Sequence, residues 1–312
     1  MINFVQNRRL YFTIAGVLLL LSVIALGASF AMYGQLLRIS IDFTGGSLFV
    51  LEFDEPVTEE AIRQVFVDQG QANPIVQRLG TGEENTWQVR TAFATTDEVQ
   101  AIMEALDAEV GTINRSLSHV DTVEPTVGAE VAQSAFLAVL AASVVVLIFV
   151  WFSFRRVPHP FSYGVASIVA MAINGVVALG FYALMGILQG WEADALFLTA
   201  LLTVIGFSVQ DIIVVFDRIR ENIPRHRGES FATIVNRSVM ETVHRSLATQ
   251  LNAMFILIAI LLFGGSTIKP FIAVMLVGML SETFTSLCVA VPIIVAWEES
   301  SHRAVTGTPV RA

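Results

Sequence analysis

Long runs of apolar residues constrain this chain more than any other feature of its sequence. Only 14% of the 312 residues are charged and the mean hydropathy is +0.69, whereas about a quarter of an ordinary soluble domain is charged. A helix of about 20 apolar residues spans the hydrocarbon core of a bilayer. The runs predict transmembrane helices within residues 1–35 and at about 131–154, 161–187, 195–216, 246–264 and 270–297. The sequence therefore predicts a polytopic α-helical membrane protein, with an extracytoplasmic domain at 36–130, five helices within 131–297 and a cytoplasmic tail at 298–312.

Basic residues predict the orientation of the helices. If the N-terminus is cytoplasmic, twelve of the 18 Lys and Arg residues fall in cytoplasmic segments and six fall outside. Five of those six lie in the 36–130 domain, a segment too long for the positive-inside rule to count. Both termini are therefore expected in the cytoplasm. The first apolar run is uncharged for 28 residues, well past the 7–15 residues of a signal peptide's apolar region, so we expect an uncleaved anchor.

The domain at 36–130 alternates strand and helix patterns. Strand formers at 47–53 precede an amphipathic helix capped by Thr58, and two further strand patterns flank the turn TGEEN at 81–85. A second helix ends at Gly111, and a last strand is expected near 113–120. The order βαββαβ predicts a ferredoxin-like α+β plait.

The same domain is strongly acidic, with 17 Asp and Glu residues against five Arg. The plait also occurs in RNA-binding modules, but binding to phosphates requires the opposite charge. Nucleic acid is therefore excluded as a partner. The acidity fits either solubility on the outer face or a surface that handles an unfolded basic segment.

A carboxylate interrupts the fourth apolar run. Asp211 follows sixteen uncharged residues and precedes five more, which places it about 24 Å along a helix. A charged group at mid-bilayer costs roughly 2.5 to 3.5 kcal/mol on insertion scales, so such residues are usually functional. The alternative is an acid near the cytoplasmic boundary that reaches water or pairs structurally.

Arg245 is the candidate cation partner of Asp211, because it enters the fifth run from the same side. Burial favours a neutral carboxyl group, whereas a neighbouring guanidinium favours the carboxylate. A contact that alternates between these states would let Asp211 capture and release protons. The alternative role for Arg245 is an anchor at the cytoplasmic boundary.

Other polar residues are candidates for a proton relay or for packing. Glu282 lies in the last run among small and hydroxyl residues that allow close helix packing, and both roles remain open for it. Ser208 lies in the fourth run, three residues before the buried aspartate. Asp217 and Arg218 follow that run, where we expect them to fix the helix end rather than carry protons. Asn174, in the third run, is expected to join helices by hydrogen bonds.

Catalytic and metal-binding motifs are missing from the sequence. It contains no HExxH, no serine–histidine pair at mid-span, no second intramembrane aspartate and no GxxxxGK[ST]. The five histidines show no ligand spacing, and a single cysteine, Cys288, excludes an internal disulfide framework. We therefore expect no enzymatic activity, no metal and no cofactor.

One motif after the first run resembles a signature of the SecD/SecF family of bacterial protein-export membrane proteins. IDFTGGS at 41–47 resembles the family's DFxGG signature through Asp42, Gly45 and Gly46. Its two glycines suit a tight turn, because glycine adopts backbone conformations that other residues avoid.

Three further motifs resemble the SecF members of the same family, and together the resemblance covers nearly the whole chain. IGFSVQDIIVVFDRIREN resembles the fourth-span signature, NRSVMETVHRSLATQ the fifth-span pattern, and FGG with residues 278–292 the last span. The chain departs from the family pattern at Glu282 and at 250–253, so no family role is carried over to those positions.

The resemblance implies a six-span half of a transporter that is related to RND transporters and pairs with a separate SecD chain. It implies proton coupling at Asp211 and Arg245 in a bacterial inner membrane. It also implies a function: completing the export of unfolded preproteins through the SecYEG channel after the ATPase SecA has pushed them. Two alternatives are an RND-like proton-coupled exporter of small molecules, for which one small plait offers little room, and a passive scaffold of a membrane complex.

Overall fold

The computed structural model describes residues 4–79, 85–154, 160–226, 228–265 and 268–306. Most of the predicted TGEEN turn, four of the arginines that predict the orientation (Arg155, Arg156, Arg227 and Arg311) and the end of the predicted tail lie outside these residues. The chain divides into two units. The bundle unit comprises Met1–Leu36, Val139–Leu184 and Leu196–Ala312, and the sheet unit comprises Leu37–Ala138 and Met185–Ala195.

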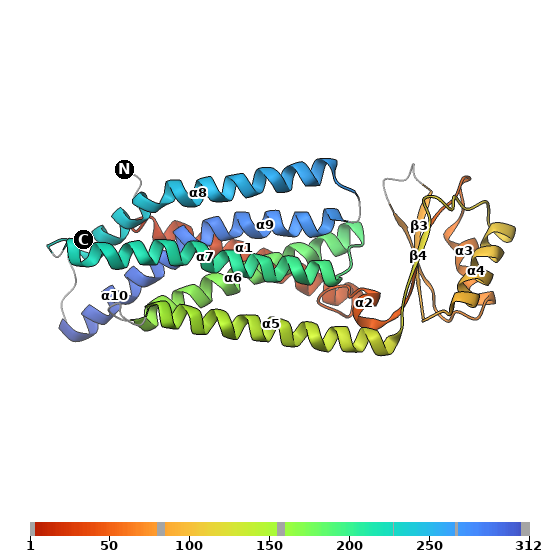
Figure 1. Ribbon diagram of the computed structural model, residues 1–312, viewed down its shortest axis with the longest axis horizontal. Coiled ribbons are helices and arrows are strands. Elements are labelled where there is room, and N and C mark those ends of the chain that lie inside the picture. Colours follow the sequence, from red (N-terminus) through yellow and green to blue (C-terminus); the bar gives the residue numbers. More distant parts are fainter. Residues whose placement is uncertain (1–3, 80–84, 155–159, 227, 266–267, 307–312) are drawn as a thin grey trace. The chain divides into compact units, whose positions relative to one another are not determined.

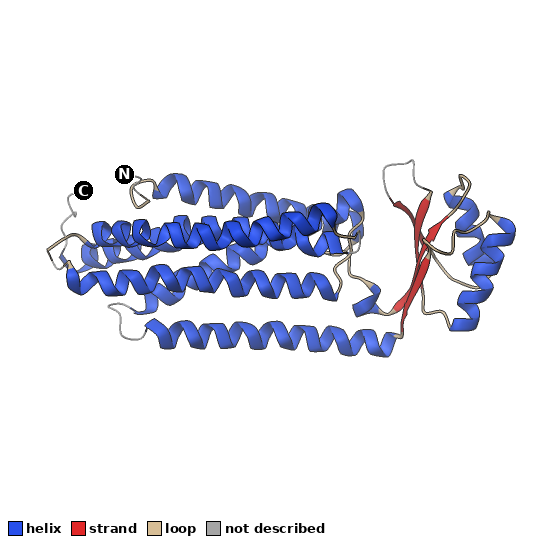
Figure 2. Ribbon diagram, turned by 45° about the horizontal axis from the view of Figure 1, so that its top comes forward, coloured by secondary structure: helices blue, strands red, loops and turns tan. Residues whose placement is uncertain are grey.

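Long helices that run side by side form the bundle unit (Figures 1 and 2). In the described chain, six helical segments are long and apolar enough to cross a membrane, and this confirms the predicted fold class. The helices are α1 (Arg8–Tyr33), α5 (Pro125–Phe154), α6 (Pro160–Gln189), α7 (Ala195–Arg225), α8 (Phe231–Phe263), and a last run of α9 (Lys269–Thr285), η2 (Ser286–Ala290) and α10 (Val291–Thr306).

Several helices are longer than the apolar runs that predict them. α5 begins at Pro125 rather than near 131, α7 continues to Arg225 beyond 216, and α8 begins at Phe231 rather than near 246. Backbone hydrogen bonds continue along a helix whatever its side chains are, so an apolar run marks only part of it. The last run, predicted as one helix at 270–297, contains a five-residue π-helical segment, η2. Such segments are often found at functional sites.

Small residues bring helices of the bundle unit close together. A Cβ added at Gly278 of α9 would overlap the side chain of Val204 on α7, and one added at Gly180 of α6 would overlap Ser22 on α1. Close approach of this kind is typical of helices packed in membranes. It places polar groups on α7 and α9 within reach of one another.

The sheet unit holds an antiparallel sheet with strand order β2-β3-β1-β4. Helices α3 (Glu59–Asp68) and α4 (Thr96–Glu109) cover one face of the sheet (Figure 1), as in the predicted ferredoxin-like plait. Its elements are α2 (Ile41–Thr44), β1 (Gly46–Glu52), α3 (Glu59–Asp68), β2 (Ile75–Leu79), β3 (Thr86–Thr91), α4 (Thr96–Glu109) and β4 (His119–Val123).

The last strand differs from its prediction. β4 spans His119–Val123 rather than residues near 113–120, and Ile113 makes only an isolated bridge to Phe53. Ile113 is nevertheless buried in the core of the plait. The segment was predicted as a strand because Ile113 is apolar, but its side chain packs into the core and the segment forms no strand of the sheet.

Local signals explain the helices of the plait. Thr95 and Glu98 form a capping box at the start of α4, which satisfies two backbone N–H groups that a helix leaves unpaired. Phe49 of β1 and Phe66 of α3 are fully buried and pack edge to face, with ring centroids 4.9 Å apart. The plait therefore has its own hydrophobic core.

Candidate functional site

Three buried polar side chains from three helices meet inside the bundle unit. The amide nitrogen Nε2 of Gln250 on α8 donates hydrogen bonds to Oδ2 of Asp211 on α7, at 3.2 Å, and to Oε2 of Glu282 on α9. The exposed fractions of Asp211, Gln250 and Glu282 are 6%, 4% and 0%. Two carboxyl groups thus share one amide group in an apolar interior.

A second polar group adjoins these residues on α7 and α9. Asn174 of α6 donates to the hydroxyl of Ser208, at 2.7 Å, and accepts from the hydroxyls of Ser281, at 2.7 Å, and Thr285, at 2.9 Å. Asn174 thereby joins three helices, as predicted for it. Ser208 belongs to this hydrogen-bond network, and in the described residues its hydroxyl makes no hydrogen bond to Asp211.

Several buried polar atoms near the carboxyl groups have no hydrogen-bond partner within the described residues. They are Oε1 of Glu282, Oε1 of Gln250 and the hydroxyl of Ser246, which lies one helical turn before Gln250 on α8. A buried polar atom without a partner is unfavourable. The cluster is therefore not satisfied as a purely structural network would be.

Arg245, the expected partner of Asp211, does not make the hydrogen bond that Asp211 accepts. That bond comes from Gln250, while Arg245 acts on Asp211 through space. The Arg245 side chain is exposed on α8. Gln250 departs from the family pattern, and its hydrogen bond to Asp211 was not predicted from the sequence. The sequence feature that could have indicated this role is the polar side chain of Gln250 inside an apolar run, five positions after Arg245.

Asp217 and Arg218 lie apart from the carboxyl groups, toward the end of α7. Arg218 pairs with Glu221, at 2.8 Å, and with Glu241 of α8, at 2.6 Å, while Asp217 pairs with Arg220, at 2.6 Å. These pairs are partly exposed. The Arg218–Glu241 pair joins α7 to α8, whereas the other two pairs lie within α7; the expected role of fixing the helix end stays a prediction.

The glycine motif forms a tight turn in the sheet unit. Gly45 and Gly46 have φ angles of 71° and 123°, a region that favours glycine. A Cβ at Gly45 would lie 2.5 Å from Cα of Pro125, where α5 begins. The carboxylate of Asp42 accepts a hydrogen bond, at 3.1 Å, from the backbone N–H of Ala195, the first residue of α7.

A group of buried charges lies next to this turn and was not predicted from the sequence. Glu192 pairs with Arg38, at 3.2 Å, and with Arg90 of β3. Burial raises the pKa of the Glu192 carboxyl against the opposite pull of Arg90 and Arg38, and burial also lowers the pKa of Arg90. The available signal was Glu192 itself, a charged residue between two apolar runs.

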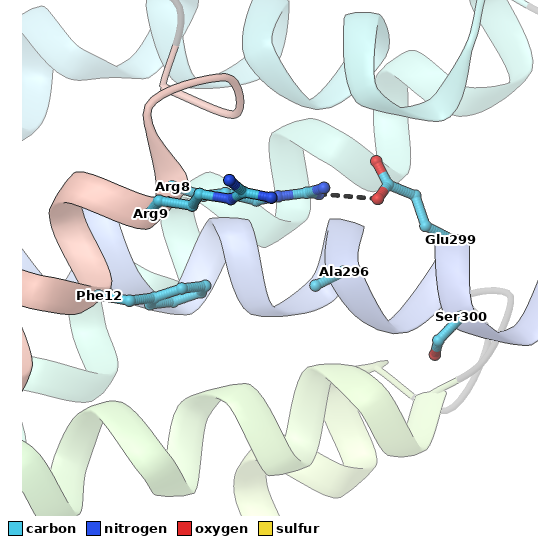
Figure 3. Close-up of a pocket in the computed structure, with 6 residues that line it drawn as sticks. All are labelled: Arg8, Arg9, Phe12, Ala296, Glu299 and Ser300. Carbon is cyan, nitrogen blue, oxygen red and sulfur yellow. Dashed lines mark hydrogen bonds and ion pairs between the residues drawn. The ribbon is translucent and has the colours of Figure 1, made fainter. Parts of the chain in front are cut away.

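A cavity of about 370 Å³ lies beside the first turn of α1 (Figure 3). Arg8, Arg9 and Phe12 of α1 line it together with Ala296, Glu299 and Ser300 of α10. Arg8 pairs with Glu299 at 2.8 Å and so holds the beginning of α1 against α10. The three residues of the carboxyl cluster do not line this cavity.

Metal-binding chemistry finds no support in the described part of the chain, where no three His, Cys, Asp or Glu residues are placed to hold an ion. The carboxyl cluster has two acidic side chains and one amide. Its chemistry is that of carboxyl groups that can bind or release protons in a low-dielectric interior.

Comparison with known proteins assigns the family. Residues 102–300 match the model of the C-terminal region of the protein export membrane proteins SecD/SecF, and residues 40–57 match the SecD/SecF GG motif. The protein translocase subunit SecF of Anaerolinea thermophila is 39% identical over 307 residues, covering 97% of this chain and 96% of the relative. The chain belongs to the SecD/SecF family. The SecF subunit of Thermobaculum terrenum is 40% identical over 272 residues, covering 84% of this chain and 85% of that relative.

Solved structures of SecD/SecF proteins share the fold. The crystal structure of SecDF from Thermus thermophilus, a translocon-associated membrane protein, superposes with a TM-score of 0.77 at 30% identity and covers 95% of this chain. A super-membrane-facing form of SecDF has a TM-score of 0.63 at 28% identity and covers 98%. This chain spans 38% and 40% of those two SecDF chains, so it corresponds to part of a SecDF protein.

Proposed function

We propose that this chain is the SecF-type subunit of a protein translocase and that it pairs with a SecD-type chain. Close relatives over nearly its full length are named as SecF translocase subunits. The SecDF chains are more than twice as long, which supports a second polypeptide as the missing part. In many transporters the coupling site lies at the interface between two structural repeats, and the interface between this chain and a SecD-type chain would be such an interface.

We propose further that proton movement through the membrane passes by way of Asp211 and drives the export step. The single observation that carries this proposal is the carboxyl group of Asp211, 6% exposed inside the bundle and hydrogen-bonded to an amide rather than to a cation. Such a group is free to change its protonation, whereas a carboxylate held by a direct ion pair stays ionised.

Arg245 supplies the opposing charge in this scheme. It acts on Asp211 through space from α8 without making the hydrogen bond itself. A small shift of α8 against α7 would strengthen or weaken that action, and so favour release or capture of a proton. Each proton that crosses about 150 mV brings roughly 3.5 kcal/mol, enough to bias a two-state element several hundredfold.

The proposed setting is a bacterial inner membrane with both termini in the cytoplasm, as the distribution of basic residues favours. The start of α1 and the end of the last helical run lie together, because Arg8 pairs with Glu299. The sheet unit would then face outward, where preprotein emerges from SecYEG after SecA has acted. No catalytic step is assigned to the chain itself.

A proton-coupled exporter of small molecules is the second candidate. In the described residues a cavity of about 370 Å³ is lined by α1 and α10 and includes neither Asp211 nor Arg245, so it does not favour that function. A passive scaffold is the third candidate, and it predicts that Asp211 affects assembly alone.

The test is Asp211→Asn in membrane vesicles that contain SecYEG, SecA and the partner SecD-type chain. We expect the variant to fold and to co-purify with the partner, because Asn has nearly the same shape. Late export should fall to the level seen when the proton gradient is collapsed. Asp217→Asn is the matched control, because Asp217 sits in an exposed ion pair, and it should export normally.

Two results would contradict the proposal. Export by Asp211→Asn that still responds fully to the proton gradient would remove Asp211 from coupling. Loss of the partner from the purified variant, together with loss of export, would favour the scaffold.

A further inference from the structure

Asp211 and Glu282 are held as a pair by one amide group. Nε2 of Gln250 donates to an oxygen of each, and an amide nitrogen carries only two hydrogens. Hydrogen-bonded nitrogen and oxygen atoms are at most about 3 Å apart, so two oxygens bonded to the same nitrogen lie within roughly 6 Å of each other. The two carboxyl groups therefore occupy one site, although they come from different helices.

The charges around the pair cannot balance two carboxylates. Asp211 on α7 is the charged group that acts on Glu282, and Arg245 on α8 acts on Asp211. The neighbours from α6 and α9, such as Asn174 and Ser281, are neutral. Two ionised carboxyl groups would face one guanidinium that bonds to neither in the described residues. Like charges that share a buried site are expected to hold one proton between them.

The hydrogen bonds point the same way. Oε1 of Glu282 is buried and has no partner in the described residues. An ionised carboxylate needs donors for both oxygens, and leaving one unsatisfied in an apolar interior is unfavourable. Binding a proton removes that negative charge and gives the group an O–H donor of its own.

We propose that Asp211, Glu282 and Gln250 form a single proton-binding site that holds one resident proton at neutral pH. An O–H bond forms on one carboxyl oxygen and lowers the charge of the pair from two negative charges to one, which Arg245 then opposes. The transported proton is the second one to bind, and its release restores the resting state. This transport step rests on the proposed function, whereas the resident proton does not.

Glu282 is therefore a proton-binding residue and not a packing residue alone. Gln250 is the positioning residue, because its amide holds both carboxyl groups in reach of one another. Ser246 lies one turn before Gln250 on α8, and in the described residues its buried hydroxyl has no hydrogen-bond partner.

Infrared spectroscopy of the intact complex in lipid tests the site directly, because a protonated carboxyl group has its own C=O absorption. At neutral pH the wild-type complex should show this band, and carbon-13 labelling of glutamate should shift it if Glu282 carries the proton for part of the time. Glu282→Gln should abolish the band. Glu299→Gln is the control and should leave it unchanged, because Glu299 pairs with Arg8 at the partly exposed end of the bundle.

Gln250→Leu gives a second readout that does not depend on Glu282→Gln folding. It should move the position of the carboxyl band, because the hydrogen bond from the amide is lost. A wild-type spectrum without the band at neutral pH, or a band that survives in Glu282→Gln, would overturn the resident proton. A band unmoved in Gln250→Leu would overturn the bridging role of the amide. These spectra need neither export nor proton flow, so their failure is distinct from failure of Asp211→Asn to lose export.

Discussion

The two units of the molecule each bury carboxyl groups, but they surround them differently. In the sheet unit, Glu192 is bonded directly to the guanidinium groups of Arg38 and Arg90. In the bundle unit, Asp211 and Glu282 are bonded to the neutral amide of Gln250. Two neighbouring cations favour the ionised form of a carboxyl group, and their bonds to it join segments of chain. A neutral amide adds no positive charge that would favour the ionised form, and the proposed function assigns proton binding to the carboxyl groups that it holds.

The charged group of the sheet unit also bears on stability. Burial disfavours both Glu192 and Arg90 in their charged forms, so their pairing is not a strong source of stability in itself. The pairing of Glu192 with Arg90 instead fixes how the loop before α7 lies on strand β3. In the bundle, the two buried carboxyl groups are hydrogen-bonded to a neutral amide, and no cation bonds to them in the described residues.

The largest expected effect comes from breaking the charged group of the sheet unit. Glu192→Gln leaves Arg38 and Arg90 partly buried without their carboxylate, and removing one partner of a buried ion pair costs about 3 to 5 kcal/mol. Deuterium exchange at the amides of β1 and β3, measured in the full chain, should rise strongly. Glu59→Gln, which breaks an exposed pair with Arg63, should change exchange little, as surface pairs contribute about 0 to 1 kcal/mol. Equal effects of the two variants would contradict the comparison.

Gly278→Val tests whether close helix packing makes the carboxyl pair. The added side chain would overlap Val204, and overpacking of this kind costs about 1 to 3 kcal/mol. Separation of α7 from α9 should also move the infrared carboxyl band. Gly206→Ala is the control, because a Cβ there meets nothing within 4 Å. Normal thermal stability and an unchanged band in Gly278→Val would show that the packing is not limiting.

Asn174→Leu should separate packing from proton binding inside the bundle. It leaves the hydroxyls of Ser208, Ser281 and Thr285 without their shared partner, at a cost of about 1 to 3 kcal/mol. The melting temperature should fall while proton-dependent export persists in the folded fraction. If export is lost as completely as in Asp211→Asn at equal protein levels, the asparagine network belongs to the proton site.

The smallest expected effect is an acid dependence of the plait. The backbone N–H of Ile113 and the guanidinium of Arg115 lower the pKa of Asp107. Its contribution is therefore present above the unfolded pKa of about 3.9 and is lost as pH falls through the lower folded value. Because the group is near the surface, the effect should stay below about 1 kcal/mol. Asp107→Asn should flatten that part of the stability curve measured by deuterium exchange, and an unchanged acid dependence would contradict it.

Much of the fold could be predicted from local sequence patterns. The six apolar runs predicted the membrane class, and strand and cap signals predicted the plait. The ends of α7 and α8 were missed, because hydrogen bonding continues past the last apolar residue. Ile113 was assigned to a strand because an inward-packing residue has the same apolar signature.

The site was predicted only in part, for a different reason. A lone charge in an apolar run marks Asp211 and draws attention to Glu282, but no sequence pattern tells which side chains meet across helices. Gln250 and the pairing of Glu192 with Arg38 and Arg90 depend on the three-dimensional approach of distant segments. Contacts between residues that are far apart in the sequence can be identified only from the three-dimensional structure.

The proposal that the carboxyl group of Asp211 carries protons can be tested by measuring proton flux through the purified complex in liposomes. A pH gradient and membrane potential are imposed, and internal pH is followed in the wild type, in Asp211→Asn and in Asp217→Asn. We expect flux to be lost in Asp211→Asn and kept in the wild type and in Asp217→Asn. Flux through Asp211→Asn at the wild-type rate would contradict it.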